Sequence, residues 1–197
     1  MKILLFDLGG VVVDYRGPER LAALTKGAMS LDEAREALST SVNLHAFERG
    51  EIAPALFAHN AVAEWRLEVT PDFFIADFET WPERFLPDAP DIIRSLNDRF
   101  RLACLSNINI PHWRQAKALG LPPLFEQAFL SHEMGARKPE PDIYQRVINR
   151  LGVDADDICF FDDSRSNIDA ALEHDLKAFH VTPEGGIEQA LKDAGVI

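Results

Sequence analysis

Residues 6–14 read Phe-Asp-Leu-Gly-Gly-Val-Val-Val-Asp (FDLGGVVVD), and they follow the apolar run Ile3-Leu4-Leu5. The short apolar stretch from Lys2 to Asp7 is typical of a buried strand. This strand ends on a carboxylate, and the glycine pair Gly9-Gly10 follows almost at once. We therefore expect the side chain of Asp7 to stand at the end of a buried strand, beside a turn, and to form part of a site.

The rest of the chain separates into an all-helical stretch and a stretch of alternating elements. Between residues 16 and 86, Ser30-Leu31-Asp32-Glu33 is a capping-box pattern, and Pro54 and Pro71 stand where first helical turns begin. We expect no strand in this stretch. From Pro87 onward helices and strands alternate, with helices expected at 89–98, 111–119, 141–150, from 164 and from 184, and strands at 101–105, 128–130, 158–161 and 178–181.

Alternating strands and helices predict an α/β fold with a doubly wound parallel sheet. The all-helical stretch is then an insertion after the first strand. We therefore expect residues 1–15 and 87–197 to form the α/β core and residues 16–86 to form an inserted α-helical cap.

The composition limits the partners of this chain. Its 197 residues carry a formal net charge of −12, and an acidic chain repels phosphate backbones, so we expect no nucleic-acid partner. Asp7 interrupts the first apolar run too early for a signal peptide, and no stretch approaches the roughly 20 apolar residues that span a bilayer. Cys104 and Cys159 lie in apolar runs and are expected to be reduced core residues. These features predict a soluble cytoplasmic protein with no membrane partner.

Polar side chains follow four of the predicted strands. In a doubly wound sheet ligands bind beyond the carboxyl ends of the strands, so these groups are expected to converge. Three carboxylates in one place repel one another unless a cation lies between them, and hard oxygen ligands suit Mg²⁺. A hydroxyl, an amide and an ammonium suit a phosphoryl group, and an aspartate facing that group can be the nucleophile. The residues are Asp7, Ser106, Asn107, Lys138, Asp162 and Asp163.

Each of these residues taken alone also has an ordinary structural interpretation. Ser106-Asn107 suits an Asx turn, and Asp162-Asp163 suits the start of a helix, where acidic residues are favoured. Lys138 suits a solvated loop. The convergence of all of them on one crevice is what favours a functional site.

The four groups together resemble the motifs of the haloacid dehalogenase-like hydrolase superfamily. In chain order, the matching segments are Phe6-Asp7-Leu8-Gly9-Gly10-Val11, Leu105-Ser106-Asn107, Lys138-Pro139 and Phe161-Asp162-Asp163-Ser164. The resemblance covers essentially the whole chain, and the predicted insertion resembles the small α-helical cap of the family. Phe47-Glu48-Arg49-Gly50-Glu51-Ile52 and Arg137-Lys138-Pro139-Glu140 are similar to the branch of sugar-phosphate phosphatases that includes α-glucose-1-phosphatase.

This resemblance implies a phosphatase that acts on small phosphorylated metabolites, sugar phosphates in particular, through an aspartyl-phosphate intermediate. Asp7 would attack phosphorus, and Lys138 would neutralise charge on Asp7 and on the transferred group. Ser106 and Asn107 would hydrogen-bond the phosphoryl oxygens. These roles agree with the general rule that phosphoryl transfer depends on positioning and charge neutralisation.

The resemblance also implies Mg²⁺ as cofactor. The ion would be held by the Asp7 carboxylate, the Gly9 backbone carbonyl and Asp163, with Asp162 beside it. The protein would be a monomer or a weak dimer.

Gly9 departs from the family pattern. Most phosphatases of the superfamily carry a second aspartate two residues after the nucleophile, where it protonates the leaving oxygen and then activates water. Three interpretations follow: a phosphatase with a substitute acid or with a sugar-phosphate leaving group of low pKa, a 2-haloacid dehalogenase, or a non-catalytic binding protein. The pair Asp162-Asp163 favours a metal-dependent enzyme over a dehalogenase.

The predicted cap offers further candidates. His45 and Arg49 share one helix face at i, i+4 spacing, with Arg49 expected to contact substrate and His45 to pack in the cap or lie on its surface. His112 is expected on the surface at a helix start, and Asp14 is expected to position the cap. The aromatic residues Trp65, Trp81, Phe73 and Phe74 are expected in the core of the cap.

Overall fold

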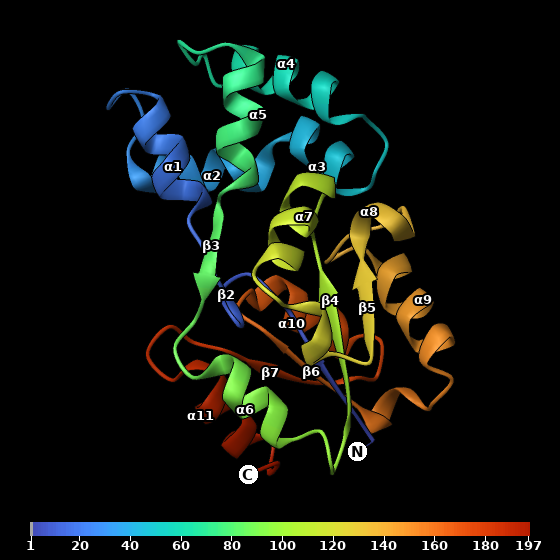
Figure 1. Ribbon diagram of the computed structural model, residues 1–197. Coiled ribbons are helices and arrows are strands. Elements are labelled where there is room, and N and C mark those ends of the chain that lie inside the picture. The colour runs from blue at the N-terminus through green and yellow to red at the C-terminus, as the bar shows by residue number, and fades with distance from the viewer. Residues whose placement is uncertain (1) are drawn as a thin grey trace.

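A computed structural model describes residues 2–197 of the chain (Figure 1). Its main sheet has five parallel strands in the order β5-β4-β1-β6-β7. The strands are β1 (Ile3–Phe6), β4 (Arg101–Ser106), β5 (Gln127–Leu130), β6 (Ile158–Asp162) and β7 (Lys177–His180). The predicted α/β fold is confirmed.

Helices cover both faces of this sheet. Strand side chains alternate between faces, so Leu4 and Phe6 pack in one hydrophobic cluster and Ile3 and Leu5 in another. The first cluster contains residues of α6 (Ala89–Ser95), α7 (Ile110–Ala118) and α11 (Gly186–Asp193), and the second contains residues of α9 (Pro141–Leu151) and α10 (Arg165–Leu172). Cys104 and Cys159 are buried free thiols, as predicted. The remaining short elements of this part are η1 (Pro122–Leu124), α8 (Ser131–Met134) and η2 (Ala155–Asp157).

The first five helices after β1 form what we call the helical segment, residues 17–79. They are α1 (Gly17–Leu24), α2 (Leu31–Thr40), α3 (Val42–Glu48), α4 (Pro54–Glu64) and α5 (Pro71–Glu79). The predicted capping box of Ser30 and Glu33 is present, and Thr70 caps α5. The segment packs around a hydrophobic cluster separate from those of the sheet, which includes Phe47, Phe57, Trp65 and Phe74 of the segment and Trp81 just after it.

Phe73 does not join this cluster, so the expectation for that residue was wrong. Its side chain is 55% exposed, whereas the adjacent Phe74 is fully buried. Helix α5 turns Phe74 and Phe78 toward the cluster because residues four apart share a face, and Phe73 consequently points away.

The expectation that residues 16–86 contain no strand was also wrong. Strands β2 (Val13–Tyr15) and β3 (Pro82–Phe85) form an antiparallel ribbon, and Arg84 pairs with Asp14 at 2.9 Å. The sequence Pro-Glu-Arg-Phe of β3 is short and polar, so it carries no hydrophobic alternation that would predict a strand. The division into a core and a cap at residues 16 and 86 stays a prediction, since β3 lies inside the predicted cap and pairs outside it.

The helical segment lies over one end of the sheet (Figure 1). Helix α5 contacts α7, and α3 contacts α8. Because α7 and α8 directly follow β4 and β5, this end is the carboxyl end of the strands. Among residues 2–197, no helix has the length and apolar character needed to cross a membrane.

Candidate active site

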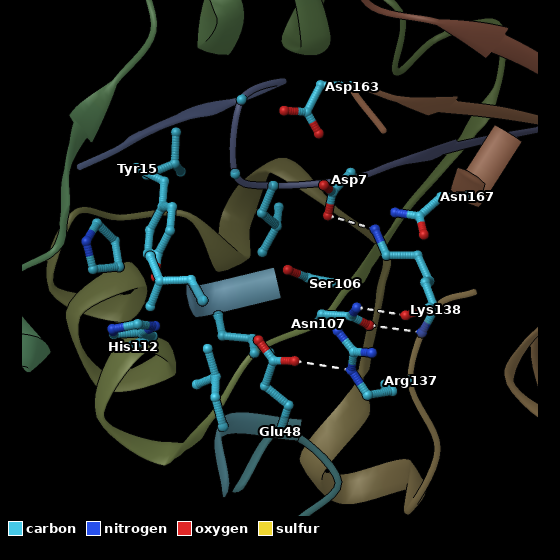
Figure 2. Close-up of a pocket in the computed structure, with 18 of the residues that line it drawn as sticks. Asp7, Tyr15, Glu48, Ser106, Asn107, His112, Arg137, Lys138, Asp163 and Asn167 are labelled. Carbon is cyan, nitrogen blue, oxygen red and sulfur yellow. Dashed lines mark hydrogen bonds and ion pairs between the residues drawn. The ribbon is translucent and has the colours of Figure 1, made fainter. Parts of the chain in front are cut away.

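A cavity of about 430 Å³ lies where the helical segment meets the carboxyl ends of the strands (Figure 2). One wall contains predicted site residues: Asp7, Gly9, Ser106, Asn107, Lys138 and Asp163. The opposite wall comes from the helical segment and includes Leu38, Leu44 and Glu48. The convergence expected from the sequence is therefore present.

Lys138 lies between two carboxylates. Its Nζ is 2.7 Å from Asp7 Oδ1 and 2.6 Å from Asp162 Oδ2, and the residue is only 1% exposed. Burial alone would lower the pKa of Lys138, but the charges of Asp162 and Asp7 raise it above its ordinary value. Asp7 thus has a fixed positive charge beside it.

Asp162 holds Lys138 in place. Its Oδ1 accepts hydrogen bonds from Ser164 N at 2.8 Å and from Asn167 Nδ2 at 2.9 Å, while Oδ2 accepts from Lys138 Nζ. Asn167 was missed in the sequence, where its only signal is its place in the first turn of α10, just after the aspartate pair. Because both Asp162 oxygens already accept hydrogen bonds, we interpret this residue as a support for Lys138, and its predicted role as a metal ligand stays a prediction.

Three carboxylates come close enough to share a cation. Asp7, Asp162 and Asp163 each place an oxygen within 4.8 Å of the others. Burial raises the pKa of Asp7 to about 7, an effect that Lys138 opposes and the two neighbouring aspartates reinforce. Burial and the charge of Asp162 also raise the pKa of Asp163. A set of oxygen donors under mutual repulsion is the chemistry that suits Mg²⁺.

Gly10 allows Asp163 to approach. Its φ is +72°, in the left-handed region, and a Cβ built there would stand 2.2 Å from Asp163 Oδ2. A side chain at this position would therefore collide with a carboxylate of the acidic cluster. Glycine satisfies both the backbone conformation and the space.

Asn107 fixes the loop that carries Lys138. Its Nδ2 donates to Lys138 O at 2.8 Å, and its Oδ1 accepts from Lys138 N at 2.8 Å. One hydrogen of Nδ2 remains for a ligand, because an amide nitrogen carries two. Ser106 ends β4, is 4% exposed and lines the cavity. Binding of phosphoryl oxygens by Ser106 and Asn107 stays a prediction.

Arg49 and His45 do not line the cavity. The Arg49 guanidinium pairs with Glu51 at 2.6 Å and with Glu140 at 3.0 Å. His45 Nε2 lies 2.9 Å from Ser39 O, so this ring nitrogen already has a partner within the helical segment. The structure therefore gives the predicted substrate contact of Arg49 no geometric support.

His112 is buried, in contrast to the expected surface position. Its Nε2 lies 2.8 Å from Phe78 O, and its Nδ1 lies 3.2 Å from Asn109 Nδ2. The ring stacks on Phe78 with centroids 4.1 Å apart. Burial lowers the pKa of His112 to about 3, so the ring is neutral at ordinary pH and links α7 to α5.

The helical segment contributes the acid of a partly buried ion pair. Glu48 Oε2 accepts from Arg137 Nε at 3.0 Å, and both residues line the cavity. A second ion pair joins Arg49 to Glu140. In this pair the helical segment provides the base and the loop before α9 provides the acid. Glu48 and Arg137 lie in the two segments that resemble the sugar-phosphate phosphatases, but the sequence predicted no role for either residue. Nothing in either segment alone indicates that these two residues meet.

The sequence of residues 1–175 matches the family model of the haloacid dehalogenase-like hydrolases. The chain belongs to this family, as the strand order and the acidic cluster at the carboxyl edge already indicated. Its enzyme class is therefore hydrolase.

Several relatives of similar length are known. The chain is 25% identical to a D-ribitol-5-phosphate phosphatase of Bacteroides thetaiotaomicron, across 95% of this chain and 94% of the relative. It is 26% identical to a sesquiterpene phosphatase of Aspergillus oryzae, across 92% and 90%. A solved structure of a family enzyme of B. thetaiotaomicron, in complex with magnesium and inorganic phosphate, superposes with a TM-score of 0.76 at 25% identity, across 92% of this chain and 94% of that one.

Proposed function

We propose that this protein is a Mg²⁺-dependent phosphatase that hydrolyses phosphate monoesters through an aspartyl phosphate on Asp7. The observation that carries the proposal is the buried contact between Lys138 and Asp7, beside two further aspartates. Relatives named as phosphatases and a family structure holding magnesium and phosphate support it. The helical segment acts in this proposal as a cap over the site.

Asp7 and Lys138 carry the bond-forming step. A carboxylate oxygen of Asp7 attacks phosphorus, and the bond between phosphorus and the leaving oxygen breaks. Lys138 keeps Asp7 oriented and offsets negative charge on the transferred group, which is the main requirement of phosphoryl transfer. Water then attacks the phosphorus of the aspartyl phosphate, and the carboxylate of Asp7 is restored.

Mg²⁺ fits the residues present. Asp7, the Gly9 carbonyl and Asp163 would hold the ion, with Asp162 behind them. When bound, it would neutralise phosphoryl charge and relieve the repulsion that adds to burial in raising the pKa of Asp7 and Asp163.

We propose sugar or polyol phosphates as the substrate class. The wall formed by the helical segment and β2 offers polar groups for hydroxyls, in Tyr15, Glu48 and Ser39, beside apolar Leu38 and Leu44. The ribitol-phosphate relative supports this class, while the sesquiterpene relative makes an apolar phosphate ester the natural comparison substrate. A cytoplasmic location and a monomeric or weakly dimeric state stay predictions from the sequence.

The test is phosphate release from a panel of sugar, polyol and terpenyl phosphates, with Mg²⁺ and with chelator. Asp7→Asn should abolish release, whereas the exposed Asp98→Asn, the same chemical change away from the cavity, should not. Phosphate release that persists in Asp7→Asn, or that is unchanged when a chelator removes Mg²⁺, would contradict the mechanism. Halide release from a 2-haloacid without metal would favour the dehalogenase alternative instead.

A further inference from the structure

The cavity contains a proton donor that could compensate for Gly9. Five titratable side chains line it besides those already assigned to phosphoryl transfer: Tyr15, Arg35, Glu48, His112 and Arg137. The arginines stay protonated at any working pH. Both ring nitrogens of His112 already lie against protein partners. Glu48 and Tyr15 remain.

Glu48 has the geometry of an acid aimed at the substrate space. One of its oxygens accepts from Arg137 Nε, and the other accepts no hydrogen bond from any residue in the range 2–197. The side chain is 13% exposed. Figure 2 shows the carboxylate directed toward the middle of the pocket, with Asp7 on the opposite side. A phosphate ester attacked by Asp7 would direct its leaving oxygen away from Asp7, because attacking and leaving oxygens lie roughly in line.

The surroundings of Glu48 favour its protonated form more than water does. Burial raises its pKa, and the cations Arg137, Lys138 and Arg49 oppose this without cancelling it. Tyr15 faces it from β2, and the charge of Glu48 adds to the burial that raises the pKa of that phenol. A raised carboxyl pKa is what a general acid working near neutral pH requires.

We propose that Glu48 donates the proton to the leaving oxygen and later removes one from water, in place of the acid missing at Gly9. This inference rests on the proposed phosphatase activity. In the first step, the bond between phosphorus and the leaving oxygen breaks as Asp7 bonds to phosphorus, and the leaving oxygen takes the proton of Glu48. In the second, water bonds to phosphorus and gives a proton to Glu48, while the bond between phosphorus and Asp7 breaks.

Arg137 is the positioning residue of this arrangement. It fixes one oxygen of Glu48 and leaves the other directed into the cavity. Its neighbour in the chain, Lys138, contacts Asp7. The acid on the helical segment and the nucleophile at the end of β1 are thus held by two consecutive residues of one loop.

The experiment compares two leaving groups in Glu48→Gln. Hydrolysis of an alkyl phosphate needs a proton on the leaving oxygen, whereas 4-nitrophenolate leaves without one. We expect kcat/KM for the alkyl phosphate to fall by about 10²-fold or more, with 4-nitrophenyl phosphate nearly unaffected. The loss of alkyl phosphate turnover at high pH, where Glu48 is ionised, should disappear in the variant. Glu51→Gln, an exposed control that pairs with Arg49, should change neither substrate.

A second variant separates chemistry from folding. A Cβ on Gly9 would stand 3.5 Å from Tyr15 Cβ, an ordinary contact, so Gly9→Asp is sterically allowed. Added to Glu48→Gln, it should restore alkyl phosphate turnover. Equal losses on both substrates, or no loss, would overturn the proposal. A leaving-group-dependent loss in Tyr15→Phe but not in Glu48→Gln would overturn it in favour of the phenol. Absence of Asp7-dependent hydrolysis of 4-nitrophenyl phosphate in the wild type would instead refute the phosphatase itself, and this inference with it.

Discussion

Comparing Gly10→Ala with Gly152→Ala separates the two requirements that the structure places on Gly10. The residue has a left-handed backbone, and it leaves space for the Asp163 carboxylate. Gly152 has a similar φ of +65°, but a Cβ there would meet nothing within 4 Å. Gly152→Ala is therefore a control that changes the backbone preference and leaves the acidic cluster intact.

The expected magnitudes differ accordingly. A left-handed conformation costs an L-residue about 1–2 kcal/mol, so both variants should lose about that much free energy of unfolding. For a chain of this size, each kcal/mol lowers Tm by about 2–4 °C. In Gly10→Ala alone, the new Cβ would lie 2.2 Å from Asp163 Oδ2, so the carboxylate must retreat by about 1 Å to reach van der Waals contact. A displacement of that size in a catalytic site can cost about 10²-fold in rate.

The assay is a Mg²⁺ titration of phosphatase activity, with Tm measured on the same samples. Gly10→Ala should show a weaker apparent Mg²⁺ affinity and a lower kcat/KM, whereas Gly152→Ala should show only the lower Tm. If both variants bind Mg²⁺ and turn over substrate equally well, Asp163 does not hold the ion in the way we infer.

Three further predictions concern other contacts. Asn107→Ala removes two hydrogen bonds to the Lys138 backbone, so it should lower the free energy of unfolding by about 2 kcal/mol in denaturant titration, and an unchanged midpoint would contradict the bidentate contact. Gly50→Ala would place a Cβ 2.4 Å from the backbone oxygen of His132, so Tm should fall further than in Gly152→Ala; an equal fall would mean that the helical segment shifts freely. The pKa of His112 is lowered to about 3 when folded, so the unfolded chain binds one more proton between pH 6.5 and 3. The free energy of unfolding should therefore fall as pH drops through that window, by up to about 1.4 kcal/mol per unit, and His112→Gln should lose this contribution.

The sheet and its helices were predictable because their signals are local. Buried strands such as Ile158–Asp162 are apolar up to their last residue, and helix starts such as Ser30 carry capping residues. The ribbon strand Pro82–Phe85 had no such signal, because it is formed by pairing with Val13–Tyr15, a segment that is distant in the sequence. Phe73 was misplaced because two adjacent phenylalanines cannot both face inward on one helix.

The site residues also differ in whether their positions follow from local signals. Residues at strand ends, such as Asp7 and Asp162, converge because the topology of a parallel sheet brings those ends together. The direction of the Arg49 side chain depended on the rotation of a short helix, and the pairing of Glu48 with Arg137 depended on how the helical segment packs against the sheet. Neither the helix rotation nor this packing can be obtained from residue spacing alone.

The β2–β3 ribbon makes the helical segment a module that can be exchanged. The chain leaves the ribbon at Tyr15 and returns at Pro82, and these two residues are cross-strand partners. Two adjacent antiparallel strand ends can also be joined by a two-residue turn. Insertions of very different length therefore fit at this point without altering the path of β1 or β4. The wall that provides Leu38 and Glu48 can thus be replaced by recombination while the aspartates and Lys138 stay where they are.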